Sequence, residues 1–275
     1  MRIVDCHVHI RGEVDPAGLL KQLDDNGVDR VILFSRPERV SLEKTRQNLL
    51  EARPLLEAEP ERISALAWVN PAIAGMGDLA AEALEQMGYA GIKIIPDHWY
   101  AYEERLEPFW ERMNSLGASI LFHTGILYGW EDGSRFCRPV YLEKLIHYRN
   151  IRFAMAHISW PWCEEALAVM GRMQAARRDG NPRWQSYIDI TPGTPPHIRR
   201  QALANAVAFC GPERLMFGTD SKAPDYMVKQ KEMAAGDLAI FAELGLDASQ
   251  TQRIMAGTAD EVFPPARHRA SRRGR

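Results

Sequence analysis

Short apolar segments recur along the chain at fairly even intervals, and segments with helical periodicity lie between them. The apolar segments are rich in Val, Ile, Leu, Phe and Ala and are bounded by Gly, Pro, Asn or Asp, which is typical of buried β-strands. We expect eight strands, at residues 2–10, 28–35, 62–70, 90–96, 118–125, 151–159, 184–192 and 214–221.

The intervening segments carry the start and stop signals of helices. Residues 16–27 begin with Pro and end with Gly, and residues 41–52 begin with a Ser that can cap the helix. Residues 77–88 and 102–117 also end on Gly. Further helices are expected at residues 162–180, 195–211, 231–246 and 251–262.

Strands and helices that alternate with short loops require parallel strands joined by crossover connections. Eight such units fit a closed (β/α)8 barrel, which typically has about 250 residues. An open doubly wound sheet would instead carry a Gly-rich phosphate-binding turn after an early strand, and DCHVHIRGEVDP at residues 5–16 contains none. We therefore predict an α/β fold, a TIM barrel, as one domain over residues 1–263, followed by a basic, disordered tail at 264–275.

Composition narrows the class of partner. The chain is 46% hydrophobic and 25% charged, as in ordinary globular proteins, and its net charge of −2 gives no bias toward nucleic acid or membranes. No apolar run is long enough to cross a bilayer, and the N-terminus does not resemble a signal peptide. Four cysteines without paired spacing indicate reduced thiols. We expect a cytoplasmic protein with a small-molecule substrate.

Polar, metal-competent residues lie at the ends of several predicted strands. His7 and His9 are two residues apart in the first strand, so their side chains share a face. His123, His157 and Asp220 end the apolar runs of the fifth, sixth and eighth strands. One such histidine could be an ordinary core residue, but burying all five side chains is costly unless a partner such as a divalent cation satisfies them. The carboxyl ends of barrel strands are also where barrel enzymes place their active sites.

Other polar residues could contact a substrate. Lys93 lies in the middle of the fourth strand, where its ammonium could pair with a substrate carboxylate or with an acid such as Asp189. The remaining candidates follow strand ends and are Arg36, Asn70, Trp160, Trp162 and Thr191. An arginine can bind a carboxylate through two hydrogen bonds, and the tryptophans could either wall the site or pack within a loop.

As a set, these motifs resemble the amidohydrolase superfamily. The resemblance lies in DCHVH at residues 5–9, Lys93, His123, His157 and GTD at residues 218–220. It is greatest to the amidohydrolase-2 branch, which includes aminocarboxymuconate-semialdehyde decarboxylase, and it extends from residue 5 to about residue 263. Members of the superfamily are distorted barrels that bind one or two divalent metals at the C-terminal mouth. In this branch one metal, usually zinc, is typical, and a homodimer is a further expectation from the family.

The resemblance implies that His7, His9, His123 and Asp220 are the metal ligands. It places His157 beside the metal-bound water or the substrate, as an acid/base or electrostatic group. Three histidines and one aspartate suit Zn²⁺ and, less distinctively, Mn²⁺ or Fe²⁺. In binuclear relatives a lysine equivalent to Lys93 is carboxylated and bridges two metals, but the closer match to the mononuclear branch favours an ordinary lysine here.

The expected reaction is hydrolysis of an amide, lactone or related carbonyl compound by a metal-activated water. Asp220 would accept the proton of that water, and His157 would stabilise the oxyanion or protonate the leaving group. The alternative is decarboxylation, without redox chemistry, of a small unsaturated or aromatic acid. A barrel that binds metal or ligand without turnover is a further alternative, against which the complete ligand set argues.

Overall fold

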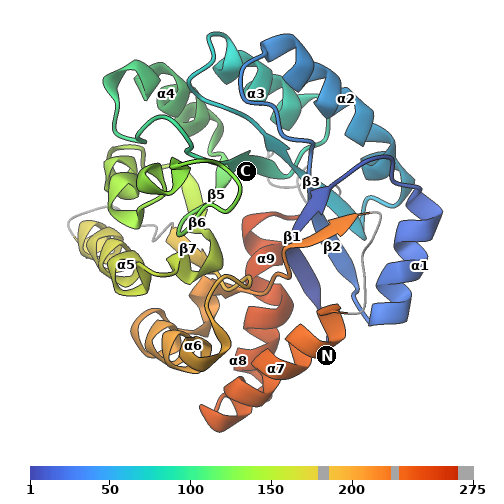
Figure 1. Cartoon of the computed structure of the whole chain (residues 1–275), viewed down its shortest axis with the longest axis vertical. Helices are drawn as coiled ribbons and strands as arrows, with labels where there is room; N and C mark the ends of the chain where they lie inside the picture. Colours follow the sequence, from blue (N-terminus) through green and yellow to red (C-terminus); the bar gives the residue numbers. More distant parts are fainter. Residues whose placement is uncertain (179–185, 224–228, 266–275) are drawn as a thin grey trace.

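The computed structural model describes residues 1–178, 186–223 and 229–265, and it contains a curled sheet of parallel strands surrounded by helices (Figure 1). The strands are β1 (Val4–Ile10), β2 (Arg30–Phe34), β3 (Ile63–Trp68), β4 (Gly91–Ile94), β5 (Ser119–Phe122), β6 (Arg152–Met155), β7 (Ser186–Asp189), β8 (Leu215–Met216) and β9 (Ser221–Ala223). Their order in the sheet is β8-β7-β6-β5-β4-β3-β2-β1-β9.

The two ends of this sheet meet in one segment of the chain, because β8 and β9 are parts of the stretch 215–223. β8 pairs with β7, and β9 pairs with β1. Between them the Cys6 amide donates to the Phe217 carbonyl at 3.0 Å, and the Asp220 amide donates to the His7 carbonyl at 2.9 Å. The predicted barrel is therefore confirmed. Its eighth strand is interrupted at residues 217–220, and residues 184–185 of the predicted seventh strand lie outside the described part.

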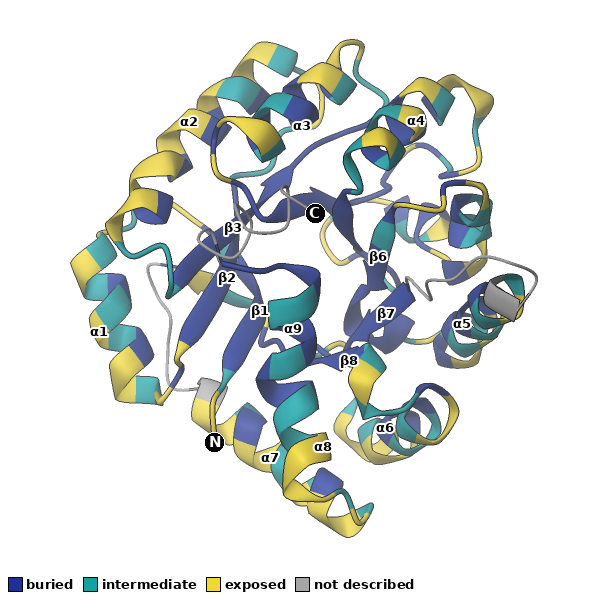
Figure 2. Ribbon diagram, turned by 180° about the vertical axis from the view of Figure 1, so that it is seen from behind, coloured by how far each residue is buried: buried dark blue, intermediate teal, exposed yellow. Residues whose placement is uncertain are grey.

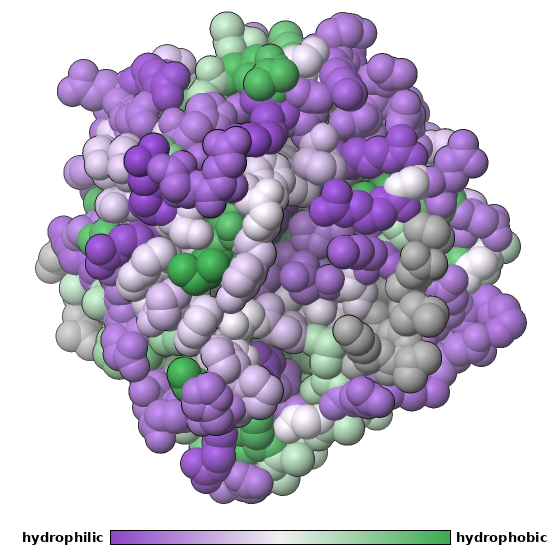
Figure 3. Space-filling model, viewed as in Figure 1, coloured by the Kyte–Doolittle hydropathy of each residue, from purple (hydrophilic) through white to green (hydrophobic). Residues whose placement is uncertain are grey.

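Helices cover the outside of the sheet, with exposed residues facing outward and buried residues facing the strands (Figure 2). They are α1 (Pro16–Asn26), α2 (Leu42–Ala58), α3 (Met76–Glu85), α4 (Glu107–Leu116), α5 (Cys163–Arg178), α6 (Pro196–Cys210) and α7 (Lys229–Glu243). All overlap the predicted helices. The crossover from β5 to β6 instead contains two 3₁₀ helices, η2 (Gly133–Phe136) and η3 (Pro139–His147). The face in Figure 3 is mainly hydrophilic, with hydrophobic residues in small groups, because the apolar sides of the helices face the sheet.

Two apolar cores result from this arrangement. One lies between the sheet and the helices, and Leu33 and Ile92 belong to it. The other fills the barrel interior, where Phe34 and Leu121 pack with side chains from the C-terminal helical segment. Both cores consist of well-buried aliphatic and aromatic side chains, so the barrel does not depend on a bound ligand for its packing.

The C-terminal segment closes the barrel at the amino ends of the strands. It comprises α8 (Ala248–Gln252), the π-helical turn η6 (Arg253–Gly257) and α9 (Thr258–Val262), in agreement with the predicted helix. Arg30, the fully buried first residue of β2, donates to Asp260 at 2.7 Å and to the Phe263 carbonyl. A Cβ on Gly91 would lie 2.9 Å from the Phe263 ring, so only glycine leaves room for that ring. The predicted tail lies outside the described residues from position 266 onward.

Two predictions about the whole chain can also be compared with the structure. All four cysteines are buried free thiols, as predicted. Among the described residues, no helix combines the length and apolar character needed to cross a bilayer.

Candidate functional site

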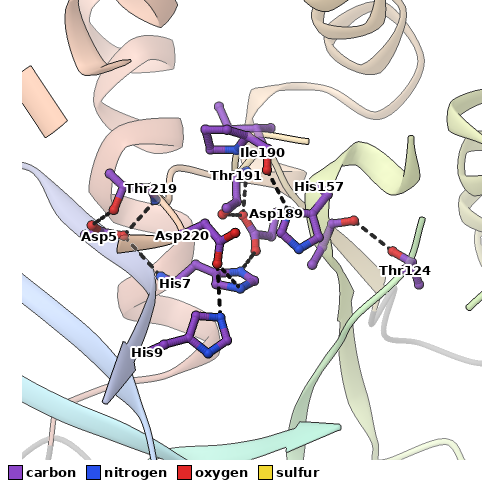
Figure 4. A network of polar contacts seen from close by, with 12 residues as sticks. Asp5, His7, His9, Thr124, His157, Asp189, Ile190, Thr191, Thr219 and Asp220 are labelled. Atoms are coloured by element: carbon purple, nitrogen blue, oxygen red, sulfur yellow. Dashed lines mark hydrogen bonds and ion pairs between the residues drawn. The ribbon is translucent and has the colours of Figure 1, made fainter. Parts of the chain in front are cut away.

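Three of the predicted metal ligands meet at the carboxyl ends of the strands (Figure 4). His7 and His9 project from β1, and Asp220 lies just before β9. The Asp220 Oδ1 atom is 3.0 Å from His9 Nε2 and 3.6 Å from His7 Nε2. One ligand atom from each residue lies within 4.8 Å of the other two. We call these three residues the His-His-Asp cluster.

A bulge in β1 determines where His7 points. The pairing with β2 shifts between Asp5 and Val8, so β1 carries one extra residue there. Cys6 therefore packs in the barrel interior and Val8 in the outer core, while the His7 ring contacts Phe34 inside the barrel at 4.6 Å. Without the bulge, strict alternation would place Cys6 and Val8 on the same face.

Asp5 holds this irregular backbone in place. Its carboxylate accepts hydrogen bonds from the His7 amide at 3.1 Å and from the Thr219 amide at 3.0 Å. The Thr219 hydroxyl donates to it as well, at 2.5 Å. Thr219 immediately precedes Asp220, whose φ of 59° is in the left-handed region. Through its bonds to His7 and Thr219, Asp5 therefore links the bulge of β1 to the break before β9. The aspartate of DCHVH is thus a structural anchor for the cluster.

The imidazole of His7 is oriented by a second carboxylate. His7 Nδ1 lies 2.6 Å from Asp189 Oδ2 at the end of β7. Asp189 in turn accepts hydrogen bonds from the Thr191 amide at 2.7 Å and from the Thr191 hydroxyl. In a neutral imidazole the proton is then on Nδ1, and the Nε2 lone pair faces Asp220. Asp189 and Thr191 therefore determine which nitrogen His7 presents to the site.

The protonation states in the cluster are those that metal binding requires. Burial lowers the pKa of His7 well below its usual value, and the positive charge of Lys93 adds to this effect. Burial also lowers the pKa of His9. Desolvation by the surrounding groups would raise the pKa of the Asp220 carboxyl, but the hydrogen bond with His9 and the nearby histidines outweigh this and hold that pKa well below its usual range. Neutral imidazoles beside an ionised carboxylate are a suitable donor set for a divalent cation.

His157 lies next to the cluster because of an unusual backbone. His157, Ile158 and Ser159 have φ values of 61°, 49° and 58°, and left-handed conformations cost about 1–2 kcal/mol per residue. Side-chain bonds hold the segment: His157 Nδ1 donates to the Pro192 carbonyl at 2.9 Å, and the hydroxyls of Ser159 and Thr124 are 2.8 Å apart. The His157 ring thereby lies 4.9 Å from the His7 ring. Strain of this kind is typical of functional sites.

His123, the fourth predicted ligand, is close to these residues but is not a member of the His-His-Asp cluster. Its ring centroid is 4.9 Å from that of His157, and its Nε2 lies 3.2 Å from the Ile126 carbonyl. With Nε2 as the donor to that carbonyl, the lone pair of the neutral ring is on Nδ1. Burial lowers the pKa of His123 well below its usual value, so the ring is neutral.

Lys93 is fully buried in the middle of β4 and does not reach the pocket mouth. Its Nζ is 4.8 Å from the centroid of the Phe34 ring and has no hydrogen-bond partner in the described part of the chain. Burial lowers the pKa of Lys93 to about 8, although Asp189 and Asp220 oppose this shift through their charge. The Lys93 amine therefore lies below the cluster and interacts with it through its charge.

A cavity of about 430 Å³ opens above the cluster. This volume is in the range usual for small-molecule sites. Its walls include His9, His123, His157 and Asp220, three tryptophans, and two cationic side chains: Trp68, Trp130, Trp160, Arg11 and Lys222. Trp68 and Trp130 are stacked, with ring centroids 5.9 Å apart and planes at 20°.

Of the six predicted substrate contacts, Trp160 lines this cavity, and the structure places the other five elsewhere within the described residues. Arg36 binds Glu51 at 2.8 Å and the Gly12 carbonyl at 2.6 Å. Asn70 donates to a loop carbonyl, and Trp162 lies under the guanidinium of Arg138. Thr191 and Lys93 are buried below the site. Strand-end position alone did not distinguish cavity-lining side chains from those that anchor loops.

The cavity residues that sequence reasoning missed include two cations and two tryptophans. Arg11 follows His9 by two positions, so the alternation that paired His7 with His9 also places it on that face. Lys222 follows Asp220 by two positions and could have been found in the same way. Trp68 was part of a predicted strand, and Trp130 comes from the loop between β5 and η2, which has no periodic pattern.

A closed parallel α/β barrel with a His-His-Asp cluster at the carboxyl ends of its strands belongs to the class of metal-competent barrel enzymes. The chain belongs to the amidohydrolase-2 family, whose sequence profile, described as amidohydrolase, matches residues 4–264. The family predicted from the motifs is thereby confirmed.

Solved structures with the same fold include different kinds of enzyme. A probable 2-pyrone-4,6-dicarboxylic acid hydrolase from Acinetobacter baumannii is 14% identical, with a TM-score of 0.63 over 96% of this chain and 99% of the other. A 2,6-dihydroxybenzoate decarboxylase from Rhizobium is 15% identical, with a TM-score of 0.63 over 95% and 98%. A zinc-bound amidohydrolase from Burkholderia multivorans is 15% identical, with a TM-score of 0.66 over 96% and 100%. No protein with a curated description matches the chain.

Proposed function

We propose that this protein is a metal-dependent hydrolase that acts on an amide, a lactone or a related carbonyl compound. The observation that carries the proposal is the convergence of His7 Nε2 and His9 Nε2 on one carboxylate oxygen of Asp220. These atoms lie beside a cavity of small-molecule size. In this proposal His7, His9, Asp220 and His123 hold one divalent metal.

The donor set fits zinc best, with Mn²⁺ or Fe²⁺ as alternatives. Two imidazole nitrogens and one carboxylate oxygen within 4.8 Å of one another are ready to share an ion. When bound, zinc supplies a Lewis acid and lowers the pKa of a coordinated water to about 7. The bound zinc in the Burkholderia multivorans amidohydrolase supports this choice.

The chain's own residues would move the protons. The Asp220 side chain is 43% exposed, so its carboxylate is accessible from the cavity and can accept a proton from the attacking water. His157 donates through Nδ1 to the Pro192 carbonyl, so its Nε2 lone pair can take up a proton; as the imidazolium, Nε2 can then deliver that proton to the leaving group or hydrogen-bond a developing oxyanion. Two separate groups are thus available, one to take up a proton and one to deliver it to the leaving group.

Decarboxylation is the second candidate. It is favoured by one observation of this chain, the two cations Arg11 and Lys222 in the cavity wall, because they could hold an acid substrate. The fold is also shared with a decarboxylase of 2,6-dihydroxybenzoate.

One experiment distinguishes these reactions. The zinc-loaded protein is incubated with panels of lactones, amides and aromatic or unsaturated acids, while acid release and CO₂ are both recorded. Hydrolysis of a lactone or amide that is lost in Asp220→Asn supports the proposal. CO₂ release without hydrolysis would assign the protein to the decarboxylases, and no turnover of either panel would favour a binding barrel.

A further inference from the structure

Two cationic side chains lie together where β1 meets β9. In the parallel pairing of these strands His9 is opposite Lys222, so their side chains share a face. Arg11 follows His9 by two residues, and its amide continues the ladder by donating to the Ala223 carbonyl at 2.7 Å. Arg11, Lys222 and His9 all line the cavity above the cluster. Lys222 is therefore one strand spacing from His9, a proposed metal ligand, and Arg11 lies two residues along the chain from it.

Neither of these cations is neutralised by an ion pair within the described part of the chain. Two other arginines near the mouth have acidic partners: Arg36 pairs with Glu51 at 2.8 Å, and Arg39 pairs with Asp97. The cavity thus carries two positive charges that an acidic group of a bound molecule could satisfy.

Another part of the cavity wall is apolar and held in place. Trp68 is 4% exposed and stacks on Trp130. The guanidinium of Arg39 lies 4.8 Å from the centroid of the Trp130 ring, and Arg39 is itself fixed by its ion pair with Asp97. An apolar or conjugated body could lie along this wall without displacing ordered polar groups.

We propose that Arg11 and Lys222 form an anion-binding subsite, so that the enzyme acts on small carboxylate-bearing compounds whose apolar body lies along Trp68 and Trp130. This inference rests on the proposed function, since it takes the His-His-Asp cluster as the place of reaction. A carboxylate held beside His9 would fix the distance and direction of the substrate from the cluster. Binding energy from a group that does not react would then position the reacting carbonyl.

The test compares matched charged and neutral ligands. Binding of 2,6-dihydroxybenzoate, benzoate and their amides to the zinc-loaded protein is measured by calorimetry, so turnover is not required. We expect each carboxylate to bind more tightly than its amide. Arg11→Met and Lys222→Met should each weaken carboxylate binding roughly tenfold, because each removes a charge-assisted hydrogen bond, and should leave amide binding unchanged.

The matched control is Lys21→Met. Lys21 is an exposed lysine of α1 that pairs with Asp25 at 2.6 Å and lies outside the cavity wall, so its removal changes net charge without touching the subsite. Carboxylate binding to this variant should equal that of the parent protein. Raising the salt concentration should weaken carboxylate binding and leave amide binding unchanged.

Zinc content is measured on the same samples, which separates the two proposals. If the carboxylates bind no more tightly than the amides, or as tightly to the double Arg11→Met, Lys222→Met variant as to the parent, the anion subsite is wrong even when zinc is present. If the parent protein binds no zinc, the proposed function fails. A charge-dependent loss of binding in the two variants would then still support the subsite.

Discussion

His7 presents its Nε2 to the site because Asp189 accepts the proton of its Nδ1. The two atoms are 2.6 Å apart, and both side chains are almost completely buried. Asp189 uses its second oxygen to accept two hydrogen bonds from Thr191. Hydrogen-bond acceptors of this kind fix the tautomer and orientation of a metal-ligating histidine, and their removal commonly lowers metal affinity.

Asp189→Asn is therefore expected to weaken zinc binding about 10- to 100-fold while the fold is retained. The reason is that an amide cannot accept all three hydrogen bonds from His7 and Thr191, because one of its two ends is a donor. Zinc affinity is measured by competition with a chelator, and Thr191→Ser, which keeps a hydroxyl, is the control. Zinc affinity equal to that of the parent protein would show that Asp189 does not orient His7.

Gly193→Ala is expected to lower kcat at least tenfold without changing zinc content. An added Cβ would lie 2.9 Å from the His157 Cβ and 3.3 Å from its ring, so His157 would have to move away from its present position. Gly236→Ala, in α7, is the matched control, because no atom lies within 4 Å of its added Cβ. An unchanged kcat in Gly193→Ala would contradict a role of His157 in proton transfer.

At the residue scale, the sequence predicts part of the site and leaves part unpredicted for a physical reason. Alternation in β1 correctly placed His7 and His9 on one face, and the strand-end position of Asp220 brought it to them. The bulge between Asp5 and Val8 has no sequence signature, although it determines that His7 points into the barrel. The loop carbonyl that His123 contacts is likewise invisible in a strand pattern.

At the scale of elements, α8, η6 and α9 act as a plug for the end of the barrel opposite the site. Phe263 extends this plug into the inner core, and Arg30 binds its carbonyl. The helix was predictable from its periodicity, and Asp247 and Gln250 form a capping box at its start. Its place across the barrel was not predictable, because it depends on contacts with strands more than 200 residues away in sequence, such as Arg30 with Asp260.

Phe263→Ala is expected to lower the free energy of unfolding by about 3–5 kcal/mol, since it removes a fully buried aromatic ring. Zinc affinity at the opposite end should change little. Urea unfolding measures the first effect and chelator competition the second. Phe209→Ala removes a ring that is 49% exposed on α6 and should cost about 1 kcal/mol or less. Equal losses in the two variants would mean that Phe263 does not plug the barrel.

Two further elements differ from simple alternation of strands and helices. The eighth strand divides into β8 and β9 because Asp220 adopts a left-handed conformation between them. The crossover from β5 to β6 uses 3₁₀ helices, and the loop that precedes η2 supplies Trp130 to the cavity. Both departures occur beside the site. Local pattern predicts regular elements well and fails where the backbone is shaped by the site.

At the scale of the whole molecule, stability and chemistry are located at opposite ends of the barrel. The inner core and the C-terminal plug lie toward the amino ends of the strands, and the His-His-Asp cluster and the cavity lie at the carboxyl ends. This division is general for barrel enzymes. It implies that a metal bound at the proposed site would add stability to a barrel that is already folded.

Removal of zinc is accordingly expected to lower the midpoint of thermal unfolding without unfolding the protein at room temperature. Zinc at 100 times its dissociation constant stabilises by about 2.7 kcal/mol, which corresponds to a shift of roughly 5–10 °C in a protein of this size. Differential scanning calorimetry with zinc and with a chelator measures the shift. His9→Ala, which removes one ligand, should show almost no difference between the two conditions.

The zinc content of the purified protein and of its ligand variants tests the central claim most directly. After exposure to zinc and dialysis, we expect about one zinc per parent chain, and little in His7→Ala, His9→Ala, His123→Ala or Asp220→Ala, with circular dichroism unchanged. A parent protein that retains no metal, or His7→Ala and His9→Ala variants that retain full occupancy, would contradict the claim that these side chains share one ion.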